Sequence, residues 1–401
     1  MANVTKPPVV RCLIILSAFS VAWQSWGEDT VEWYDTQVQQ SVQERDEYYK
    51  KWMACGNLGW TCPDGSPGYY GFTDSVADGL AAIYEATDRE YYLEKLIEYC
   101  RAIMAQGKDN NGDGYLDYFH WMPDRDRAQE YDKWDYEHSY AAACYCNIMR
   151  TLARCARVGR LGPHYQRHKA DIDEIAAFVD KHVIEKWEKG EQELSLEQYL
   201  NLTSFTINGV HSHLGSLLVD AWLATGNQHY RDLAAAFAEK VKAAWVLYSN
   251  GSYAWSANGG IIVPVDYMGT DHNMQDISHG TRVVRFAVIA HRAGIVVTDA
   301  DIEQFLNTFN KNLWRGETEK FAEYVNGADK RTNGGYSIIT QWVSLGAFDP
   351  ATHQRMVNWT GGGRSPAKYH EDKIHYYGNL ALNLKLQADG YSLQPWTPPG
   401  Q

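Results

Sequence analysis

The sequence lacks runs of basic residues, and its 401 residues include 50 Asp and Glu against 37 Lys and Arg. Nucleic acids and anionic membrane surfaces attract clustered positive charge, so neither is expected as a partner. No Pro/Ser-rich linker and no shift in composition divides the chain, which favours one domain. Charged residues make up 22% of the chain, which excludes a polytopic membrane protein, and the 45% of hydrophobic residues can build a large core.

Aromatic residues, by contrast, are abundant: 15 Trp, 27 Tyr and 11 Phe. A core alone would draw more on Leu, Ile and Val, whereas Tyr and Trp also carry a polar edge. The excess indicates that some of the rings serve a purpose other than core packing.

The N-terminus predicts export. Lys6 and Arg11 precede an apolar segment, 12–23, that is too short to span a bilayer comfortably. This order is typical of a secretory signal, and a terminal helix is the alternative. We therefore expect residues 1–27 to be a signal peptide and residues 28–401 to form a secreted or periplasmic protein, free of the membrane once the signal is removed.

Six cysteines follow residue 27, and an oxidising compartment is compatible with disulfides. Cys55 and Cys62 form the best candidate pair because glycines let the short loop between them close. The other four lie in apolar helical patterns and are interpreted as buried thiols: Cys100, Cys144, Cys146 and Cys155.

From residue 37 to 390 the sequence predicts helix after helix, separated by loops rich in Gly, Asp and Asn. An Ala-Thr turn followed by a Tyr near the start of a second helix occurs twice. The separation between Thr87 and Thr225 equals that between Tyr92 and Tyr230. Looser helical hairpins are expected at 140–182, 280–313 and 337–357. Repeats of this size predict antiparallel helix pairs that bury their inner faces on their neighbours.

Five to seven such hairpins could form an open solenoid or close into an (α/α) toroid, and the lack of strand–helix alternation disfavours a parallel-sheet enzyme. The polar loops between hairpins carry the histidine and aromatic residues, and a toroid gathers such loops at one mouth. We therefore predict an all-α fold, an (α/α) toroid or barrel. A single catalytic domain would cover 28–401 as a monomer, with only the Pro-rich tail, 395–401, unpacked.

The densest group of polar residues, Asn208 to Gly215, directly precedes an apolar helix. Asn208 can donate its amide to a carboxylate, and His211 and His213 at the helix entrance can point into a cleft. The alternative is an Asn-Gly turn in which His213 is a core residue.

A second group runs from Asp271 to Arg282. Asp276 or Ser278 is expected to cap the next helix, which places His279 in its first turn, where the helix dipole disfavours the protonated imidazole. A neutral His279 could act as a base or as a hydrogen-bond donor. The alternative is a histidine that only packs.

The third group, Asp329 to Tyr336, combines Arg331 with Tyr336. A phenol is a poor base at neutral pH, but an adjacent guanidinium stabilises its phenolate. The alternative is a Gly-Gly loop with a packing Tyr. Further candidates for substrate binding are His213, Tyr136, His138, Tyr140, Trp121, Arg282, Tyr253 and Trp255.

Residues 109–117 match the start of a calcium-binding loop, whose oxygen ligands would come from Asp109, Asn111, Asp113 and Asp117. The last position of such a loop, which should supply a bidentate Glu, is His120. The loop is compatible with a weak calcium site, and equally with a turn that aims its aromatic residues into a cleft. No metal or other cofactor is expected to be required.

Aromatic rings along a cleft suit sugars, whose apolar faces lie flat on Tyr and Trp. A glycoside hydrolase needs two carboxylates across the scissile bond. The available acids form no unmistakable pair: Glu137, Asp266, Asp271 and Asp276. The three groups instead supply Asn, His, Arg and Tyr. That set suits β-elimination on a uronate, in which donors neutralise the C5 carboxylate, a base removes the C5 proton and an acid protonates the leaving O4.

On these motifs the sequence resembles the alginate and glucuronan lyases with an (α/α) toroid fold, most of all polysaccharide lyase family 38. The resemblance rests on Asn208, His211, His213, His279, Arg331 and Tyr336. It implies that Asn208 and Arg331 neutralise the carboxylate. It also implies that His279 or His211 assists or acts as the base, and that Tyr336 is the acid and sometimes also the base. Asn208 is not directly followed by His, unlike the Asn-Asn-His form of some of these lyases, so the choice between His211 and His213 stays open.

The expected substrate is thus an anionic polysaccharide, alginate or glucuronan. The alternatives are an (α/α) glycoside hydrolase or unsaturated-uronyl hydrolase using acids such as Glu137 and Asp276, and a non-catalytic glycan-binding protein. The net charge of −13 argues against a polyanionic substrate, so basic residues at the cleft would have to override it. The candidates for that role are Arg282, Arg285, Lys330, Arg331 and Arg364.

Overall fold

The computed structural model describes residues 29–50, 70–105, 137–189, 212–256, 274–329, 340–359, 370–390 and 392–397, together with positions 107, 109, 112 and 114–116. Over these residues the chain is mostly helical, with one antiparallel pair of short strands, β1 (Val246–Leu247) and β2 (Tyr253–Ala254). The predicted all-α class is confirmed. The predicted signal peptide, 1–27, and the predicted pair of Cys55 and Cys62 lie outside the described residues.

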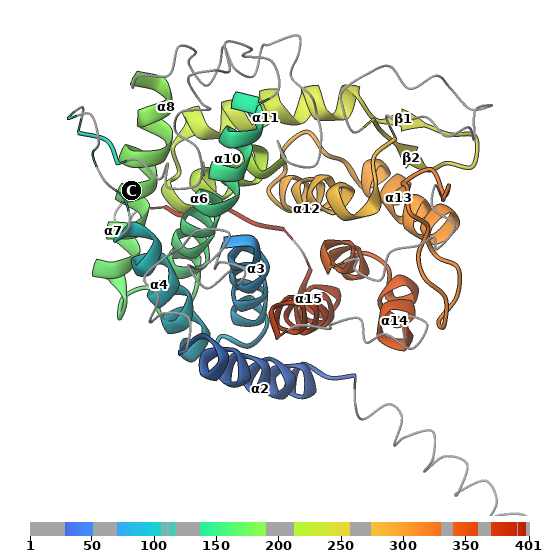
Figure 1. Ribbon diagram of the computed structural model, residues 1–401, viewed down its shortest axis with the longest axis horizontal. Helices are drawn as coiled ribbons and strands as arrows, with labels where there is room; N and C mark the ends of the chain where they lie inside the picture. The colour runs from blue at the N-terminus through green and yellow to red at the C-terminus, as the bar shows by residue number, and fades with distance from the viewer. Residues whose placement is uncertain are drawn as a thin grey trace, which may run out of the picture.

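Hairpins of contacting helices follow one another along the chain (Figure 1). They are α3 (Tyr70–Thr87) with α4 (Glu90–Met104), α6 (Glu137–Leu161) with α7 (Lys169–Val179), α10 (Ser212–Thr225) with α11 (Gln228–Ala243), α12 (Ile277–Arg292) with α13 (Asp299–Asn307), and the 3-10 helix η6 (Thr340–Ala347) with α14 (Pro350–Asn358). α2 (Val31–Lys50) precedes them and α15 (His370–Asp389) follows. α7 continues as the π-helix η4 (Asp180–Glu185) and α8 (Lys186–Lys189), and α13 as the π-helix η5 (Thr308–Leu313).

The two Ala-Thr turns have the same hydrogen bonds. Thr87 and Thr225 each donate their hydroxyl to the carbonyl one turn back and accept the backbone amide two positions on. The residue after each Thr is in the left-handed region, Asp88 at φ 55° and Gly226 at φ 72°. A left-handed residue reverses the chain tightly, so the sequence repeat is confirmed as a repeated turn.

The tyrosine of each repeat also has the same role. The hydroxyl of Tyr92 donates to Asp35 on α2 (2.5 Å), and the hydroxyl of Tyr230 donates to Asp180 on η4 (3.0 Å). Both rings are buried. Each Tyr therefore ties its hairpin to the peripheral helix that precedes it, which confirms that these two rings belong to hairpin packing.

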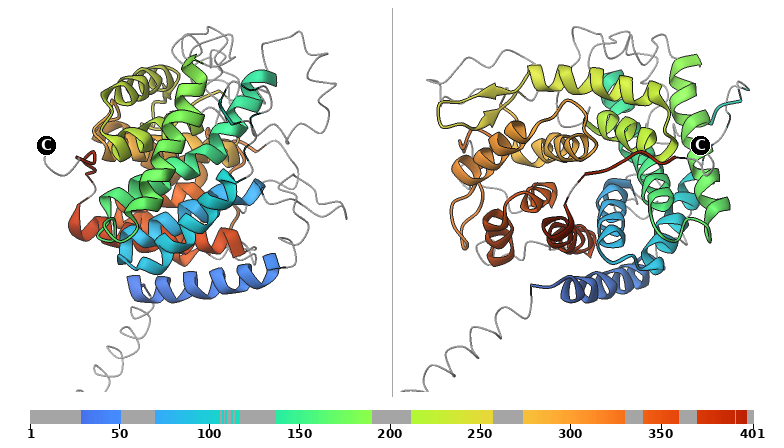
Figure 2. Two further views of the ribbon diagram at one scale, coloured as in Figure 1. Left: turned by 90° about the vertical axis from the view of Figure 1, so that its left-hand side faces the viewer. Right: turned by 180° about the vertical axis from the view of Figure 1, so that it is seen from behind.

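The first helix of each hairpin lies toward the centre of the molecule. α3, α6, α10, α12, η6 and α15 each contact the next, and α15 contacts α3. α2, α4, α7, α11, α13 and α14 lie at the periphery (Figures 1 and 2). Where α15 meets α3, a Cβ on Gly79 would lie 2.5 Å from the backbone of Ile374, and one on Gly378 would lie 2.4 Å from the Gly79 carbonyl oxygen. Only glycine allows the two backbones to approach so closely.

The described part of the C-terminal tail, 392–397, is packed, whereas the prolines of 395–401 predicted an unpacked tail. The amides of Leu393 and Trp396 donate to the carbonyls of Arg292 (2.6 Å) and Leu223 (2.8 Å), in the last turns of α12 and α10. Helix C-termini leave carbonyls without intrahelical partners, and the tail supplies the missing donors. The guanidinium of Arg160 lies 4.4 Å from the centre of the Trp396 ring. Figure 2 shows the tail crossing one end of the central helices.

Cys100 and Cys155 are buried free thiols, as predicted. Of Cys144 and Cys146, which lie on α6, only the backbone is described. None of the described helices is both long enough and apolar enough to cross a membrane.

Candidate active site

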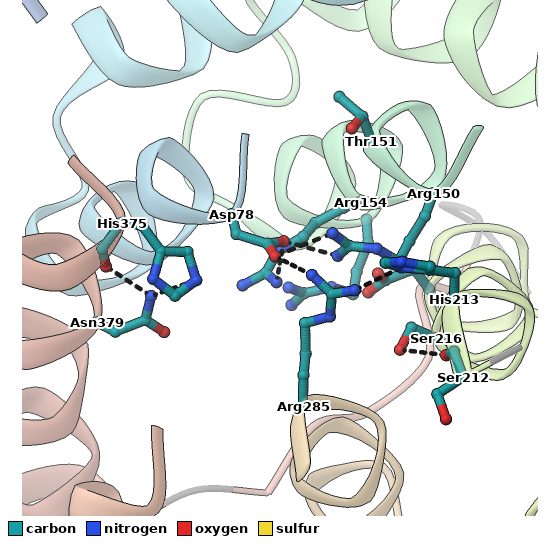
Figure 3. A network of polar contacts seen from close by, with 12 residues as sticks. Asp78, Arg150, Thr151, Arg154, Ser212, His213, Ser216, Arg285, His375 and Asn379 are labelled. Atoms are coloured by element: carbon teal, nitrogen blue, oxygen red, sulfur yellow. Dashed lines mark hydrogen bonds and ion pairs between the residues drawn. The ribbon is translucent and has the colours of Figure 1, made fainter. Parts of the chain in front are cut away.

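A layer of buried charge links four of the central helices (Figure 3). The carboxylate of Asp78 on α3 accepts from Arg150 (2.6 and 2.9 Å) and Arg154 (2.7 Å) on α6 and from Arg285 on α12 (2.5 Å). Arg285 also donates to Nδ1 of His213 on α10 (2.6 Å). Burial alone would raise the pKa of Asp78, but the three guanidinium groups hold it well below its usual value, so the carboxylate is ionised.

A second layer joins the same four helices. Glu85 on α3 accepts from Arg157 on α6 (2.7 Å) and from Arg292 on α12 (2.9 Å), and Asp220 on α10 accepts from Nε of Arg157 (2.6 Å). Burial would raise the pKa of Glu85, and the two arginines lower it instead. These residues are buried or nearly so, and each charge therefore depends on its partners.

The two layers establish the direction of the helices. In each helix the second layer lies about two turns after the first. The corresponding pairs are Asp78 and Glu85, Arg150 and Arg157, His213 and Asp220, and Arg285 and Arg292. On all four helices the residue of the second layer comes later in the sequence than the residue of the first layer. The helices α3, α6, α10 and α12 therefore run parallel. Their N-terminal ends lie together at one end of the molecule, and the C-terminal tail covers the opposite end.

His279 lies at the N-terminal end of α12. Asp276 caps this helix: one carboxylate oxygen accepts the His279 amide (3.0 Å) and the other contacts Nδ1 of the ring (2.7 Å). The His279 side chain is 50% exposed. Burial would raise the pKa of Asp276, but the bonds from His279 lower it. Because an ionised carboxylate only accepts, Nδ1 donates to Asp276, and Nε2 is the ring nitrogen that points away from this bond.

His213 is a neutral imidazole. Its pKa lies well below the usual value because the ring is buried and because Arg285, Arg282 and Arg150 are close. Arginine only donates, so Nδ1 of His213 accepts and Nε2 carries the hydrogen. The structure therefore places His213 inside the first charge layer, at the second residue of α10.

The charge of Arg282 acts both on His213 and on Asp276, the partner of His279. Arg282 lies one turn after His279 on α12, and its charge lowers the pKa of both His213 and Asp276. Three predicted residues, His279, Arg282 and His213, are thus brought near one another by α10 and α12. They supply a basic nitrogen, a cation and a neutral hydrogen-bonding ring at the N-terminal end of the parallel helices.

Two predicted substrate-binding residues pack elsewhere. Trp255 is fully buried, stacked on Trp342 (ring centres 6.3 Å apart) and edge-on to Phe305. Tyr253 donates its hydroxyl to Asp301 (2.8 Å), and burial followed by this bond raises its pKa. The assignment of Trp255 to sugar stacking is therefore corrected, because neither face of its ring is accessible.

Several predicted residues lie outside the described part of the chain: Tyr336, Asn208, His211, Arg331, Tyr136 and Trp121. His138 and Tyr140 occupy the first turn of α6, and only their backbone is described. That turn lies at the same end of the parallel helices as His279.

The predicted calcium loop is described only in part. Asp109 accepts the amides of Gly112 (2.7 Å) and Gly114 (3.0 Å). Both glycines have positive φ, 80° and 84°. Asn111, Asp113 and Asp117 lie outside the described residues, so a weak calcium site stays a prediction.

A second group of possible metal ligands lies at the periphery. Glu90, Glu94 and His168 bring potential ligand atoms within 4.8 Å of one another. Glu90, however, already contacts His168 (2.7 Å) and accepts from Arg167 (2.8 Å). These contacts describe an ion-pair cluster on the surface.

The buried charge layers were not predicted from the sequence, apart from His213 and the mention of Arg285 among basic residues. The signal was present: Asp78 and Asp220 interrupt strongly apolar helical segments, and each has a polar residue two turns away. A charged residue on an apolar face must find a partner, and that rule could have revealed the layers.

A scan against models of known protein families found no match to the chain, and a search of curated proteins found no similar sequence. The function is therefore inferred from the site itself.

Proposed function

We propose that this protein is a polysaccharide lyase that cleaves a uronic-acid-containing polysaccharide, alginate or glucuronan, by β-elimination. The observation that carries the proposal is the half-exposed side chain of His279. Its Nδ1 is bonded to Asp276, and no bond of its Nε2 to another described residue is found. A neutral imidazole fixed in this tautomer is suited to remove a proton from carbon.

The proposed architecture is an (α/α) toroid. The closed order of contacts from α3 through α6, α10, α12, η6 and α15 back to α3 supports it, as do the parallel directions of four of these helices. A toroid would bring the segments before the central helices together at one mouth. Asn208 and His211 precede α10 in the sequence, and Arg331 and Tyr336 precede η6.

In the proposed reaction the uronate binds at this mouth with its C5 carboxylate toward the cationic and amide groups. Asn208, Arg331 and Arg282 neutralise the carboxylate, which makes the C5 proton more acidic. His279, or alternatively His211, removes that proton, and Tyr336 protonates the leaving O4 as the bond between C4 and O4 breaks. The products are a shortened chain end and an unsaturated uronate, and no cofactor takes part.

The charge distribution removes the objection that the net charge of −13 raised. The two buried layers contain five arginines and three carboxylates among the described residues. The parallel helices also direct their partly positive N-terminal ends to the same place. Both contributions favour a positive potential at that end, which would attract a polyanion locally although the molecule as a whole is acidic.

The hydrolase alternative has less support. A pair of carboxylates flanking a scissile bond would need Asp276 as a free acid or base. Asp276 instead holds both the amide and the ring of His279.

The test is the ultraviolet absorbance of the conjugated double bond that elimination creates, measured with alginate, glucuronan and a neutral glucan. His279→Gln is expected to lower kcat/KM by about 100-fold or more, the range for loss of a general base. His291→Gln is the matched control, because His291 also contacts an aspartate, Asp299 (2.7 Å), near the opposite end of α12.

New reducing ends without the absorbance change would contradict elimination and favour a hydrolase. Binding of the polymer without any cleavage would favour a glycan-binding protein. Full activity in His279→Gln would leave the lyase possible and would transfer the role of base to His211 or Tyr336.

A further inference from the structure

Two cysteines lie at the contact between the first and second hairpins. Cys100 belongs to α4, the outer helix of the first hairpin, and Cys155 belongs to α6, the inner helix of the second. The two helices are in contact, with α4 at the periphery and α6 toward the centre (Figure 1). Both side chains are fully buried, and both thiols are free in this structure.

A shared backbone acceptor brings the two cysteines together. The Cys100 thiol donates to the carbonyl of Thr151 on α6 (3.9 Å). In an α-helix this carbonyl also accepts the amide four residues later, which here belongs to Cys155. The sulfur of Cys100 and the backbone of Cys155 are therefore neighbours of the same oxygen atom. The side chains interact as well: burial raises the pKa of Cys100 well above its usual value, and a hydrogen bond with the Cys155 side chain raises it further.

We propose that Cys100 and Cys155 form a disulfide bond that joins α4 to α6 when the protein folds in an oxidising compartment. A disulfide requires two cysteines that the fold has already brought close together. The shared carbonyl and the contact between the two side chains meet that requirement. The predicted export would supply the compartment. The proposal does not depend on the proposed lyase activity.

The oxidant is a small disulfide of the class of oxidised glutathione. The thiolate of one cysteine attacks a glutathione sulfur and releases the first glutathione, which leaves a mixed disulfide. The second cysteine loses its proton, attacks the protein sulfur of the mixed disulfide and releases the second glutathione. Two protein thiols are thus oxidised to one disulfide, and one glutathione disulfide is reduced to two thiols.

Burial determines when the bond forms. The fold shields both sulfurs from solvent, and the raised pKa of Cys100 leaves little of the reactive thiolate. We therefore expect the exchange to take place during folding, before α4 and α6 enclose the pair. The same burial then protects the bond from reducing thiols, so that it acts as a lasting link between two hairpins.

The first experiment identifies the bonded residues. The purified protein is reduced in urea and refolded with an excess of oxidised over reduced glutathione. Free thiols are alkylated under denaturing conditions, and a non-reducing digest is analysed by mass spectrometry. A linked pair of peptides that contains Cys100 and Cys155 is expected, and dithiothreitol should separate it. Alkylation of both cysteines, or a bond from either one to a different cysteine, would overturn the proposal.

The second experiment measures the effect of the bond on stability. The oxidised protein is expected to unfold at a midpoint about 5 °C above that of the reduced protein, because the bond closes a long loop in the unfolded chain. Cys155→Ala should lose this difference. Cys146→Ala is the matched control, because it removes another cysteine from the same helix, and it should keep the difference.

A difference in Cys155→Ala as large as in the wild type would contradict the pairing, and so would its loss in both variants. If Cys155→Ala does not fold, Cys100→Ala replaces it and is expected to give the same result. The linked peptides of the wild type decide the question if neither variant folds.

Discussion

The two charge layers join the same four helices and differ in balance. The second layer, with Glu85, Asp220, Arg157 and Arg292, has equal numbers of acids and arginines. The first layer sets one carboxylate, Asp78, against three arginines. The balanced layer shows that helix packing does not require an excess of positive charge. Among the contacts of the described residues, the layer in which arginines outnumber carboxylates lies nearer the N-terminal ends of these helices.

The largest expected effect comes from removing the shared carboxylate. Asp78→Asn removes the carboxylate that three buried guanidinium groups share, and we expect a loss of about 3–5 kcal/mol in the free energy of unfolding. Glu85→Gln should cost less, about 2 kcal/mol, because Arg157 keeps its bond to Asp220. Urea unfolding followed by circular dichroism measures both.

The control for this comparison is the double variant Asp78→Asn, Arg154→Met, which also removes one of the three guanidinium groups that bond to Asp78. It should recover part of the stability lost by Asp78→Asn alone, as expected for residues that interact directly. Equal losses in Asp78→Asn and Glu85→Gln would show that the two layers contribute alike to stability.

The dependence of stability on pH is expected to follow from the same carboxylates. The pKa values of Asp78 and Glu85 are lowered in the folded protein because arginines outweigh the effect of burial. Between the folded and unfolded values the unfolded chain binds more protons, so their contribution is complete above the unfolded pKa of about 4 and is lost as the pH falls below it.

Glu85→Gln should therefore flatten the decrease of unfolding free energy below about pH 4, since one group fewer takes up a proton on unfolding. Asp232→Asn, which changes an exposed residue of α11, is the matched control and should leave the curve unchanged. The measurement is urea unfolding at a series of acidic pH values. An unaltered acid limb in Glu85→Gln would contradict the assigned ion pairs.

Much of the fold could be predicted from the sequence because its signals are local. Helical periodicity and the repeated turn at Thr87 and Thr225 depend on residues close together in the chain, and both are found in the structure. The described part of the tail was predicted wrongly. Its prolines indicate a chain that does not form regular structure, but they give no information about the carbonyls at the ends of α10 and α12 that hold Leu393 and Trp396.

The candidate site was predictable where one helix supplies the geometry. The cap at Asp276 and the position of His279 both follow from a short sequence and are confirmed. The ion pair between Asp78 and Arg285 joins residues that are far apart in the sequence, and no local pattern indicates it. Trp255 was predicted to bind substrate as one of the aromatic residues on the loops. Burial depends on what packs against a segment, and here Trp342 and Phe305 cover the ring.

The smallest expected effect is at the covered end of the helices, beyond the second layer. Trp396→Ala removes the ring that contacts Arg160 and Tyr165, and we expect a loss of about 1 kcal/mol in stability, within the range for an exposed or partly buried cation–π contact. The main-chain bonds of the tail to α10 and α12 would remain. Because the ring lies far along the helices from His279, the proposed turnover of polyuronate should be unchanged in the same variant. A fall in turnover without a matching loss of stability would show that the tail influences the N-terminal end of the parallel helices, where His279 lies. It would contradict the expectation that the end covered by the tail contributes to stability alone.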